Sequence, residues 1–226
     1  MSVQGQLGTA ANASNGHPQA KIIRVQPTFH PSDAPESSMV QSTLKTLDLD
    51  KHIEGGYFVL TDLSTQSIPS PYPPQALSPR TMAITAAFHD GTISPTRLLS
   101  TTIYYYLTPH RPMGSFHKNR SKIIHTLHRG RGQYVLVRES GKVETFVVGK
   151  DIEKGEKLSW VVEGDVYKAS FLLEDAPGKG SEGLLISETV VPGFDYADHE
   201  FLEEQMLRKL VSGAQADALK WLVKDH

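Results

Sequence analysis

The 226-residue chain contains no cysteine, and its positive and negative charges nearly cancel. Without cysteine there are no disulfide bonds, no thiolate metal ligands and no cysteine nucleophile. Lys and Arg number 23 against 25 Asp and Glu, which gives a net charge of −2. Because no strong field of one sign exists, we expect neither nucleic acid nor a membrane surface as a partner.

Long apolar runs are missing as well. No segment approaches the roughly 20 apolar residues that a membrane-spanning helix needs. Residues 1–18 have neither the basic start nor the apolar centre of a signal peptide. We therefore expect a cytoplasmic protein. Phosphate-binding glycine loops and the G-x-S-x-G motif of serine hydrolases are also absent from the sequence.

The composition divides the chain into three parts. Residues 1–37 are rich in small and polar residues that bury too little apolar surface to offset ordering entropy, so we expect a disordered or extended tail. One edge strand at 22–29 is an option within it. Residues 38–200 form the predicted main domain, with a proline-rich insertion at 63–80. Residues 201–226 change to helical periodicity and predict a C-terminal helical segment.

Within the main domain the pattern is mainly β. A serine cap and apolar residues at helical spacing predict a short helix at 38–47. Short β-branched and aromatic segments between glycine turns are typical of a sandwich or jelly roll. The predicted strands are 57–60, 81–88, 98–108, 122–128, 133–139, 142–149, 158–164, 167–174 and 184–191. Five prolines make 63–80 a long loop. Two helices are predicted at 201–211 and 214–223.

Reactive side chains concentrate between residues 110 and 128. This window holds four of the ten histidines, which are His110, His117, His125 and His128. Histidine is the side chain most readily poised near neutral pH. A solvated basic hairpin is the alternative interpretation. A strand directs residues three apart, such as His125 and His128, to opposite faces, so the spacing does not favour a metal site.

Several segments together resemble one known family. They are EGGYF (54–58), STTIYYYLT (100–108), GSFHKNRSKIIHTLHRG (114–130), a G-E-x-L-x-W-x-V-x-x-G segment (155–164) and VVPGFDYADHEF (190–201). This combination resembles the cupin superfamily and, within it, the Cupin_5 group, also called the domain of unknown function 985. The resemblance implies a cupin double-stranded β-helix, or jelly roll, with an internal cavity.

With the helices expected from periodicity, the predicted fold class is mainly β: a jelly roll with a short N-terminal helix and one or two C-terminal helices. Homodimers are common in the family that the chain resembles. We therefore expect a homodimer formed by strands that flank the cavity and by the 201–223 helices.

Metal-binding cupins carry two histidine-rich motifs, and this sequence departs from both. By the resemblance, Ser115 stands at the first histidine position, His117 at the second, Lys122 at the glutamate and Tyr167 at the last histidine. A lysine at a ligand position would repel a cation. The resemblance therefore implies no metal site and no other cofactor.

The mapped positions favour metal-independent acid–base chemistry on a small metabolite. The motif would direct His117 inward as general base, Tyr167 as acid and Lys122 as stabiliser of a developing enolate. The expected substrate-binding residues are Tyr104, Tyr106, Ser115, Glu54 and His128. Such a site would support epimerisation, tautomerisation, dehydration or cyclisation, with the 63–80 loop as a possible lid. The alternative is a binding module that holds the metabolite without turnover.

Overall fold

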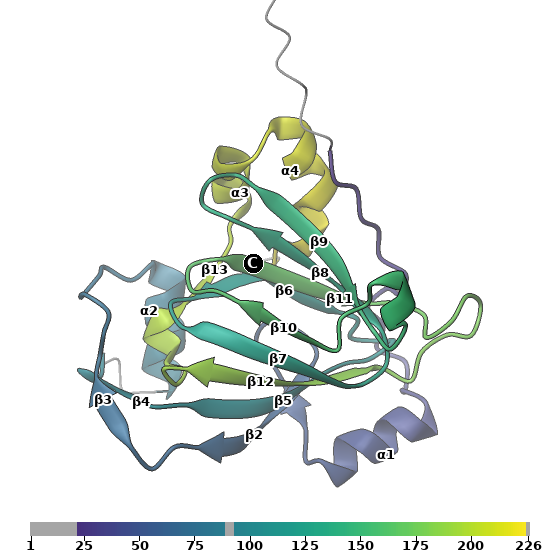
Figure 1. Ribbon diagram of the computed structural model, residues 1–226, viewed down its shortest axis with the longest axis horizontal. Helices are drawn as coiled ribbons and strands as arrows, with labels where there is room; N and C mark the ends of the chain where they lie inside the picture. The colour runs from purple at the N-terminus through teal and green to yellow at the C-terminus, as the bar shows by residue number, and fades with distance from the viewer. Residues whose placement is uncertain (1–21, 89–92, 225–226) are drawn as a thin grey trace, which may run out of the picture.

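The computed structural model describes residues 22–88 and 93–224. The described residues form thirteen strands and four short α-helices. Most of the strands belong to two sheets that face one another (Figure 1). This arrangement confirms the mainly β jelly roll expected from the sequence.

One sheet has six strands in the spatial order β1-β2-β5-β12-β7-β10. Its strands are β1 (Asp50–Lys51), β2 (Tyr57–Leu63), β5 (Thr101–Leu107), β12 (Leu184–Val191), β7 (Lys122–Arg129) and β10 (Ser159–Val162). The other sheet has five strands in the order β13-β6-β11-β8-β9. These are β13 (His199–Phe201), β6 (Met113–Asn119), β11 (Tyr167–Leu172), β8 (Gly132–Val137) and β9 (Val143–Val148). All neighbouring strands pair antiparallel, so each strand directs alternate residues into the jelly roll.

The helices lie outside the two sheets. They are α1 (Ser38–Thr46), α2 (Pro79–Phe88), α3 (Glu204–Leu210) and α4 (Gly213–Leu219). Helix α1 begins as predicted, because the Ser37 side chain accepts a hydrogen bond from the Val40 N–H. Both helices expected near the C-terminus are present. A small separate sheet pairs β3 (Ser67–Pro69) with β4 (Thr96–Leu98).

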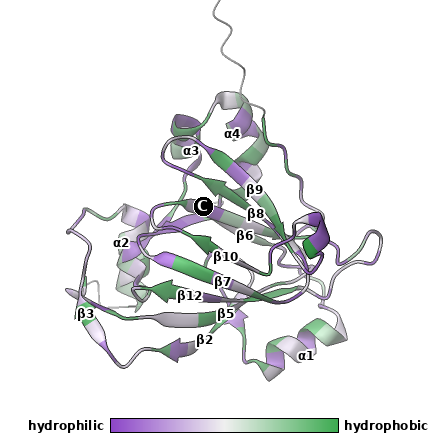
Figure 2. Cartoon of the chain, viewed as in Figure 1, coloured by the Kyte–Doolittle hydropathy of each residue, from purple (hydrophilic) through white to green (hydrophobic). Residues whose placement is uncertain are grey.

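Three apolar clusters hold these layers together. One fills the space between the two sheets, one lies between the five-stranded sheet and the C-terminal helices, and one lies beneath α1. Hydrophobic residues follow strands β8, β10 and β12 (Figure 2). The interior between the sheets is nevertheless only partly apolar, and its polar part is the candidate site.

The sequence interpretation was wrong for residues 81–88, which form helix α2 instead of a strand. Proline is favourable at a first helical position, here Pro79, and the Ser78 hydroxyl accepts a hydrogen bond from the Thr81 N–H at 3.1 Å. These helix-start signals outweigh the β-branched and aromatic residues that suggested a strand. Strands β6 and β13 were not predicted, because their sequences contain few β-branched residues.

The segment before α1 is extended, and the optional edge strand at 22–29 is absent. Its partner is a side chain, not a strand. The Ile23 N–H donates to Gln215 Oε1 at 2.8 Å, and Gln215 Nε2 donates to the Ile23 carbonyl at 2.7 Å. Val25 is buried in the cluster under the C-terminal helices. The part of the predicted tail before residue 22 lies outside the described residues.

Candidate functional site

A small closed cavity lies between the two sheets. Most of its lining is polar: Glu54, Tyr105, His117, Tyr134, Lys168, Ala169, Ser170 and Glu188. Measured as the volume open to the centre of a water molecule, the cavity is about 10 Å³. It therefore has room for about one water molecule or ion. Buried polar groups are costly unless they are paired, so a polar cluster at this depth is a candidate for function.

Glu54 reaches the interior because two glycines follow it. Gly55 and Gly56 have φ angles of +116° and +63°, which residues with a side chain rarely adopt. A Cβ atom on Gly55 would lie 2.0 Å from the Met113 carbonyl oxygen. The loop can thus press against β6, where the Ser115 N–H donates to the Glu54 carbonyl at 2.8 Å. The two glycines of the E-G-G motif therefore allow the loop to place the Glu54 carboxylate in the interior.

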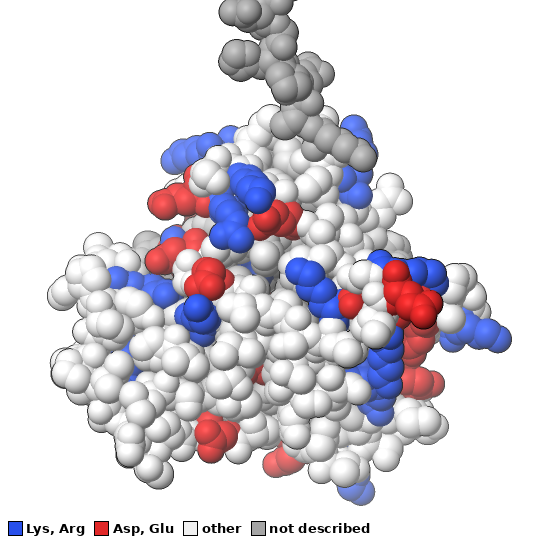
Figure 3. Space-filling model, in the orientation of Figure 1, with Lys and Arg blue, Asp and Glu red and all other residues white. Residues whose placement is uncertain are grey.

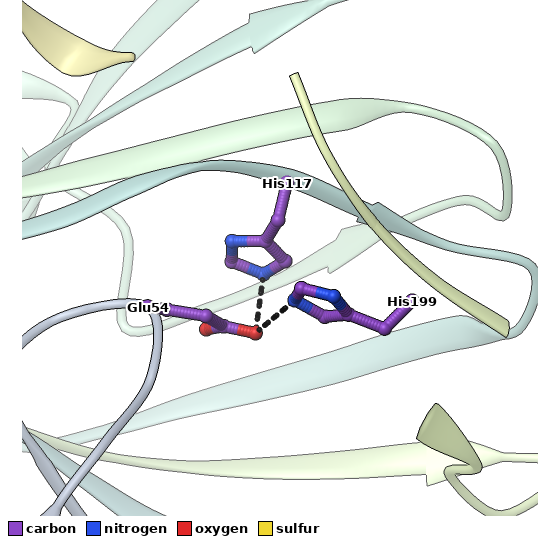
Figure 4. A group of neighbouring side chains, drawn as sticks. All are labelled: Glu54, His117 and His199. Atoms are coloured by element: carbon purple, nitrogen blue, oxygen red, sulfur yellow. Dashed lines mark hydrogen bonds and ion pairs between the residues drawn. The ribbon is translucent and has the colours of Figure 1, made fainter. Parts of the chain in front are cut away.

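Two histidines meet this carboxylate at a single oxygen (Figure 4). Glu54 Oε1 lies 3.2 Å from His117 Nε2 and 3.1 Å from His199 Nε2. The two imidazole rings are stacked, with centroids 5.3 Å apart. All three side chains are at least nine-tenths buried. Among the described residues, these are the ones whose His, Asp or Glu ligand atoms cluster closely enough to hold a metal ion.

Burial and neighbouring charge set the protonation of this cluster. Burial lowers the pKa of His117, Glu54 opposes that shift, and Lys168 lowers the pKa further, to about 3. His117 is therefore neutral at pH 7. Burial raises the pKa of Glu54, but its histidine neighbours outweigh that effect and hold the pKa well below its usual range. Glu54 is a carboxylate.

A second polar cluster is built around Lys168 and Glu188, which line the same cavity. Lys168 Nζ donates to Glu188 Oε2 at 2.6 Å and to His125 Nε2 at 3.0 Å. The His125 ring is fully buried and stacks on Trp160 with ring centroids 5.0 Å apart. Burial, followed by the Lys168 charge, lowers the pKa of His125 well below its usual range. The Lys168 and Glu188 side chains are thus in direct contact, and burial raises the pKa of Glu188 although the contact with Lys168 opposes the shift.

An open pocket of about 220 Å³ lies next to the closed cavity and shares Glu54 with it. Its lining includes the cationic side chains Arg111 and Lys224, together with Ser115 and His52. His52 Nδ1 lies 3.5 Å from Glu54 Oε2, the carboxylate oxygen that does not face His117. The interior carboxylate is therefore connected to a pocket that ligands can enter.

Of the residues named from the sequence, the structure brings His117, Glu54 and Ser115 together. Ser115 contributes through its backbone: its N–H binds the Glu54 carbonyl, and its own carbonyl accepts a hydrogen bond from His117 Nδ1 at 2.8 Å. His117 lines the closed cavity and not the open pocket. Its expected role as a base in direct contact with a metabolite therefore does not fit the cavity size.

Tyr167 and Lys122 do not face the cavity, and their inward placement was wrong. Tyr167 packs in the apolar cluster beneath the C-terminal helices, and its hydroxyl donates to Glu200 at 3.3 Å. Burial and the Glu200 charge raise its pKa well above its usual range, so it remains a neutral phenol. Lys122 is half exposed and pairs with Glu163 at 3.2 Å. Successive strand residues alternate between faces, so a register error of one residue exchanged Tyr167 for Lys168.

The sequence analysis also chose the wrong face of strand β5 for the cavity. Tyr105, not Tyr104 or Tyr106, lines the cavity. Tyr104 lies edge-on to the exposed His128, with ring centroids 5.4 Å apart. Tyr106 is buried beneath α1, where its hydroxyl binds the Glu182 carbonyl and Arg129. These three predicted binding residues therefore lie outside the interior site.

His199, Lys168 and Glu188 were not identified from the sequence. His199 lies in the VVPGFDYADHEF segment (190–201), whose last four residues, D-H-E-F, do not have the composition of a strand. Helix α2 packs against β13, and the Thr81 hydroxyl donates to the His199 carbonyl at 3.0 Å. Lys168 and Glu188 could have been recognised as charged residues within otherwise apolar or neutral strands, because such residues are rarely buried without a purpose.

The proline-rich segment does not cover this site. The Tyr72 hydroxyl lies 2.8 Å from the Ser121 hydroxyl, and Arg120 donates to the Pro73 carbonyl at 3.0 Å. The segment thus packs against the β6–β7 turn. It lines a pocket of about 440 Å³ that has no residue in common with the two that contain Glu54.

Comparison with known proteins agrees with this architecture. The family model described as "Cupin superfamily (DUF985)" matches residues 41–202. The chain belongs to the cupin superfamily. It is 46% identical over 196 residues to "Uncharacterized protein YML079W" of Saccharomyces cerevisiae, covering 85% of this chain and 89% of that one.

Two solved structures share the fold. A hypothetical protein from Leishmania major has a TM-score of 0.65 at 23% identity, covering 82% of this chain and 98% of its own. Protein SO0799 from Shewanella oneidensis has a TM-score of 0.61 at 19% identity, with the same coverage. At these identities the likeness shows the cupin fold alone. Within the part of the chain that the structure describes, no helix is long and apolar enough to cross a membrane.

Proposed function

We propose that this cupin is an enzyme that uses acid–base chemistry on a small anionic metabolite bound in the open pocket. The observation that carries the proposal is the position of Glu54. Its carboxylate is buried against two histidines on one side and faces His52 in the open pocket on the other. A histidine oriented by a buried carboxylate is a recurrent proton-accepting unit in enzymes.

The pocket lining indicates the charge and size of the substrate. Arg111 and Lys224 both line it, and burial lowers the pKa of Lys224, with Arg80 adding to the shift. Arg111 donates to the Gly56 carbonyl at 3.2 Å, which fixes the guanidinium at the entrance. Two cations that flank a volume of about 220 Å³ suit a metabolite of few atoms that carries a carboxylate or phosphate.

The reaction we propose begins with transfer of a proton from substrate carbon to His52. The C–H electron pair moves toward the adjacent carbonyl or carboxylate, whose developing negative charge Arg111 and Lys224 stabilise. Return of a proton from solvent to the other face of the carbon gives an isomer, and His52 then releases its own proton to solvent. Loss of a leaving group from the neighbouring carbon gives an unsaturated product. These outcomes are the isomerase and lyase classes expected from the sequence, with His52 in place of His117 and Tyr167.

The test is proton exchange, because it requires no knowledge of the product. A panel of small hydroxy, keto and sugar acids is incubated with the protein in D₂O, and loss of the C–H signal is followed by ¹H NMR. We expect exchange for at least one acid, slowed about 10²–10⁴-fold in His52→Gln. Arg111→Gln should weaken binding instead. His128→Gln, on an exposed residue, is the control.

A binding module is the second candidate, and the same experiment separates it from the enzyme. Saturable binding of an acid that depends on Arg111, without exchange by the wild-type protein, would assign the pocket to binding alone. Exchange that persists unchanged in His52→Gln would place the base elsewhere. Absence of both binding and exchange across the panel would overturn the proposal of an anionic substrate.

We also propose a homodimer that forms through the outer face of the six-stranded sheet. Ile124 and Val161 pair across β7 and β10 on this face and are 40% and 48% exposed. Val191 on neighbouring β12 is exposed as well. Lys, Arg, Asp and Glu are sparse over this region of the surface (Figure 3). The C-terminal helices bury Leu207 and Leu219 against their own sheet, so these residues are not free for a partner.

A further inference from the structure

We propose that Glu54, His117 and His199 form a binding site for one divalent transition-metal cation. The three residues come from a loop and two neighbouring strands, and they converge on one point in the interior (Figure 4). This inference goes beyond the proposed function, because cation binding does not depend on any reaction in the open pocket.

The spacing of the three atoms fits a metal centre. Bonds of about 2.0–2.1 Å in a tetrahedron place neighbouring ligand atoms about 3.3 Å apart. Glu54 Oε1 is 3.2 Å from His117 Nε2 and 3.1 Å from His199 Nε2. All candidate ligand atoms lie within 4.8 Å of one another. A cation would therefore require only small side-chain shifts.

The hydrogen bond on the far side of His117 determines which nitrogen is free. The Ser115 carbonyl can only accept, so His117 Nδ1 carries the proton and donates to it at 2.8 Å. In the neutral ring, Nε2 then presents a lone pair. That atom is buried and has no hydrogen-bond partner. It faces Glu54 Oε1, which also presents lone pairs, so the two atoms repel each other. A cation bound between them would be coordinated by both. A carbonyl bond of this kind also orients metal-bound histidines in proteins.

Charge balance supports the same conclusion. The Glu54 carboxylate has ion-pair contacts within 4.0 Å only to His52, His117 and His199 among the described residues. The ammonium of the cavity, Lys168, is already 2.6 Å from Glu188. A buried carboxylate without a cation is costly. One bound cation would supply the missing positive charge.

The donor atoms select the class of cation. Two imidazole nitrogens and one carboxylate oxygen suit Zn²⁺, Fe²⁺, Co²⁺ and related ions, whereas Mg²⁺ and Ca²⁺ prefer oxygen ligands. Three protein ligands leave a further coordination position open. When bound, the cation would supply a Lewis acid beside the open pocket, because Glu54 borders both cavities.

This site replaces the sequence-based expectation that the protein binds no metal. That expectation considered the usual cupin positions, with Lys122 as a repelling cation and Tyr167 as a non-ligand. In the structure both side chains point away from the cavity, and two ligands come from segments outside those motifs. Only His117 belongs to both sets.

The test uses the full chain, purified without a histidine tag and stripped by a chelator. Calorimetry with Zn²⁺ should show one equivalent bound with a dissociation constant in the micromolar range or tighter, and Mg²⁺ should give no signal at this site. Co²⁺ should give the visible absorption bands of a nitrogen- and oxygen-ligated ion. Absence of stoichiometric Zn²⁺ and Co²⁺ binding would overturn the proposal, whatever the result of the exchange assay.

Variants assign the site. Glu54→Gln and His199→Gln should each weaken Zn²⁺ binding at least 100-fold. The matched controls are His125→Gln, which alters the buried histidine that contacts Lys168, and His128→Gln, which alters an exposed one. Both should bind within about twofold of wild type. Unchanged binding in Glu54→Gln and His199→Gln would overturn the assignment.

A measurement on the wild-type protein covers the case in which these variants do not fold. X-ray absorption of the Zn²⁺-loaded protein should show two imidazoles and oxygen donors at about 2.0 Å. ¹⁵N NMR of the stripped protein at pH 7 should show His117 Nε2 without a proton. A His117 ring protonated on both nitrogens would mean that a proton already serves as the cation, and would contradict the proposal.

Discussion

Two polar clusters lie inside the same jelly roll, and they differ in how their charges are balanced. In one, Lys168 contacts both Glu188 and His125 at hydrogen-bond distance. In the other, Glu54 faces histidines, and the nitrogens that His52 and His117 direct toward it have no hydrogen-bond partner. The side chains of the Lys168 cluster satisfy one another by hydrogen bonds, which suits a structural role in the interior. In the second cluster histidines alone, among the described residues, contact the buried carboxylate, with His199 Nε2 at 3.1 Å, so this cluster is the better candidate for function.

The largest effect should come from breaking the balanced cluster. Lys168→Met leaves the Glu188 carboxylate buried without its ammonium, which should cost about 3–5 kcal/mol of unfolding free energy, measured by urea denaturation. The matched control is Lys122→Met on β7, which removes an exposed Lys–Glu pair and should change stability by less than about 1 kcal/mol. Equal losses in the two variants would mean that Glu188 is not held by Lys168.

A smaller loss of unfolding free energy should follow from a change in the loop that positions Glu54. Gly55→Ala places a Cβ atom 2.0 Å from the Met113 carbonyl at a φ of +116°, so the loop must move away from β6. We expect a loss of about 2–4 kcal/mol from strain and crowding. Zn²⁺ affinity should fall with it.

Gly178→Ala is the control for backbone strain alone. Its φ is +71°, but a Cβ atom there would meet nothing within 4 Å. It should cost about 1 kcal/mol and leave Zn²⁺ binding unchanged. If Gly55→Ala were equally mild and Zn²⁺ binding stayed intact, the loop would not position Glu54 as we describe.

The pH dependence of stability should test the Lys168 cluster through His125. The pKa of His125 is lowered in the folded state, first by burial and then by Lys168. The unfolded chain therefore takes up this proton first, and folded-state stability falls as pH drops below about 6.5. The slope for one such group approaches about 1.4 kcal/mol per pH unit.

His125→Gln removes the group that titrates. The difference in unfolding free energy between wild type and His125→Gln should narrow as pH falls from 7 to 5. His128→Gln, which changes an exposed histidine of the same strand, should leave the wild-type profile in place. A constant difference between wild type and His125→Gln across this range would show that His125 is not held neutral in the fold.

The smallest effect on the subunit itself should come from the outer face of β7. Ile124→Asp should turn a dimer into a monomer in light scattering while changing subunit stability by less than about 0.5 kcal/mol. Ile152→Asp alters a residue that is more exposed, at 64%, but lies away from this sheet. It should leave the oligomeric state unchanged. A wild-type monomer at micromolar concentration would contradict the proposed interface.

The sequence alone determined the jelly roll and part of its site. Strand periodicity and glycine turns located most strands, because alternation with one buried face is a local property. The E-G-G motif singled out Glu54, and the resemblance to cupins singled out His117. Both lie in the interior, since a polar residue in a motif of this kind can be recognised without its partners.

The tertiary structure decided which side chains share that interior. Tyr167 and Lys168 are neighbours in sequence, and only the pairing of β11 with β6, which sets Lys168 opposite His117, determines which one faces the cavity. A shift of one residue exchanges the two faces of a strand, and local pattern does not fix the register. His199 lies 145 residues from Glu54 and reaches it only because β13 adds to the edge of the sheet beside β6.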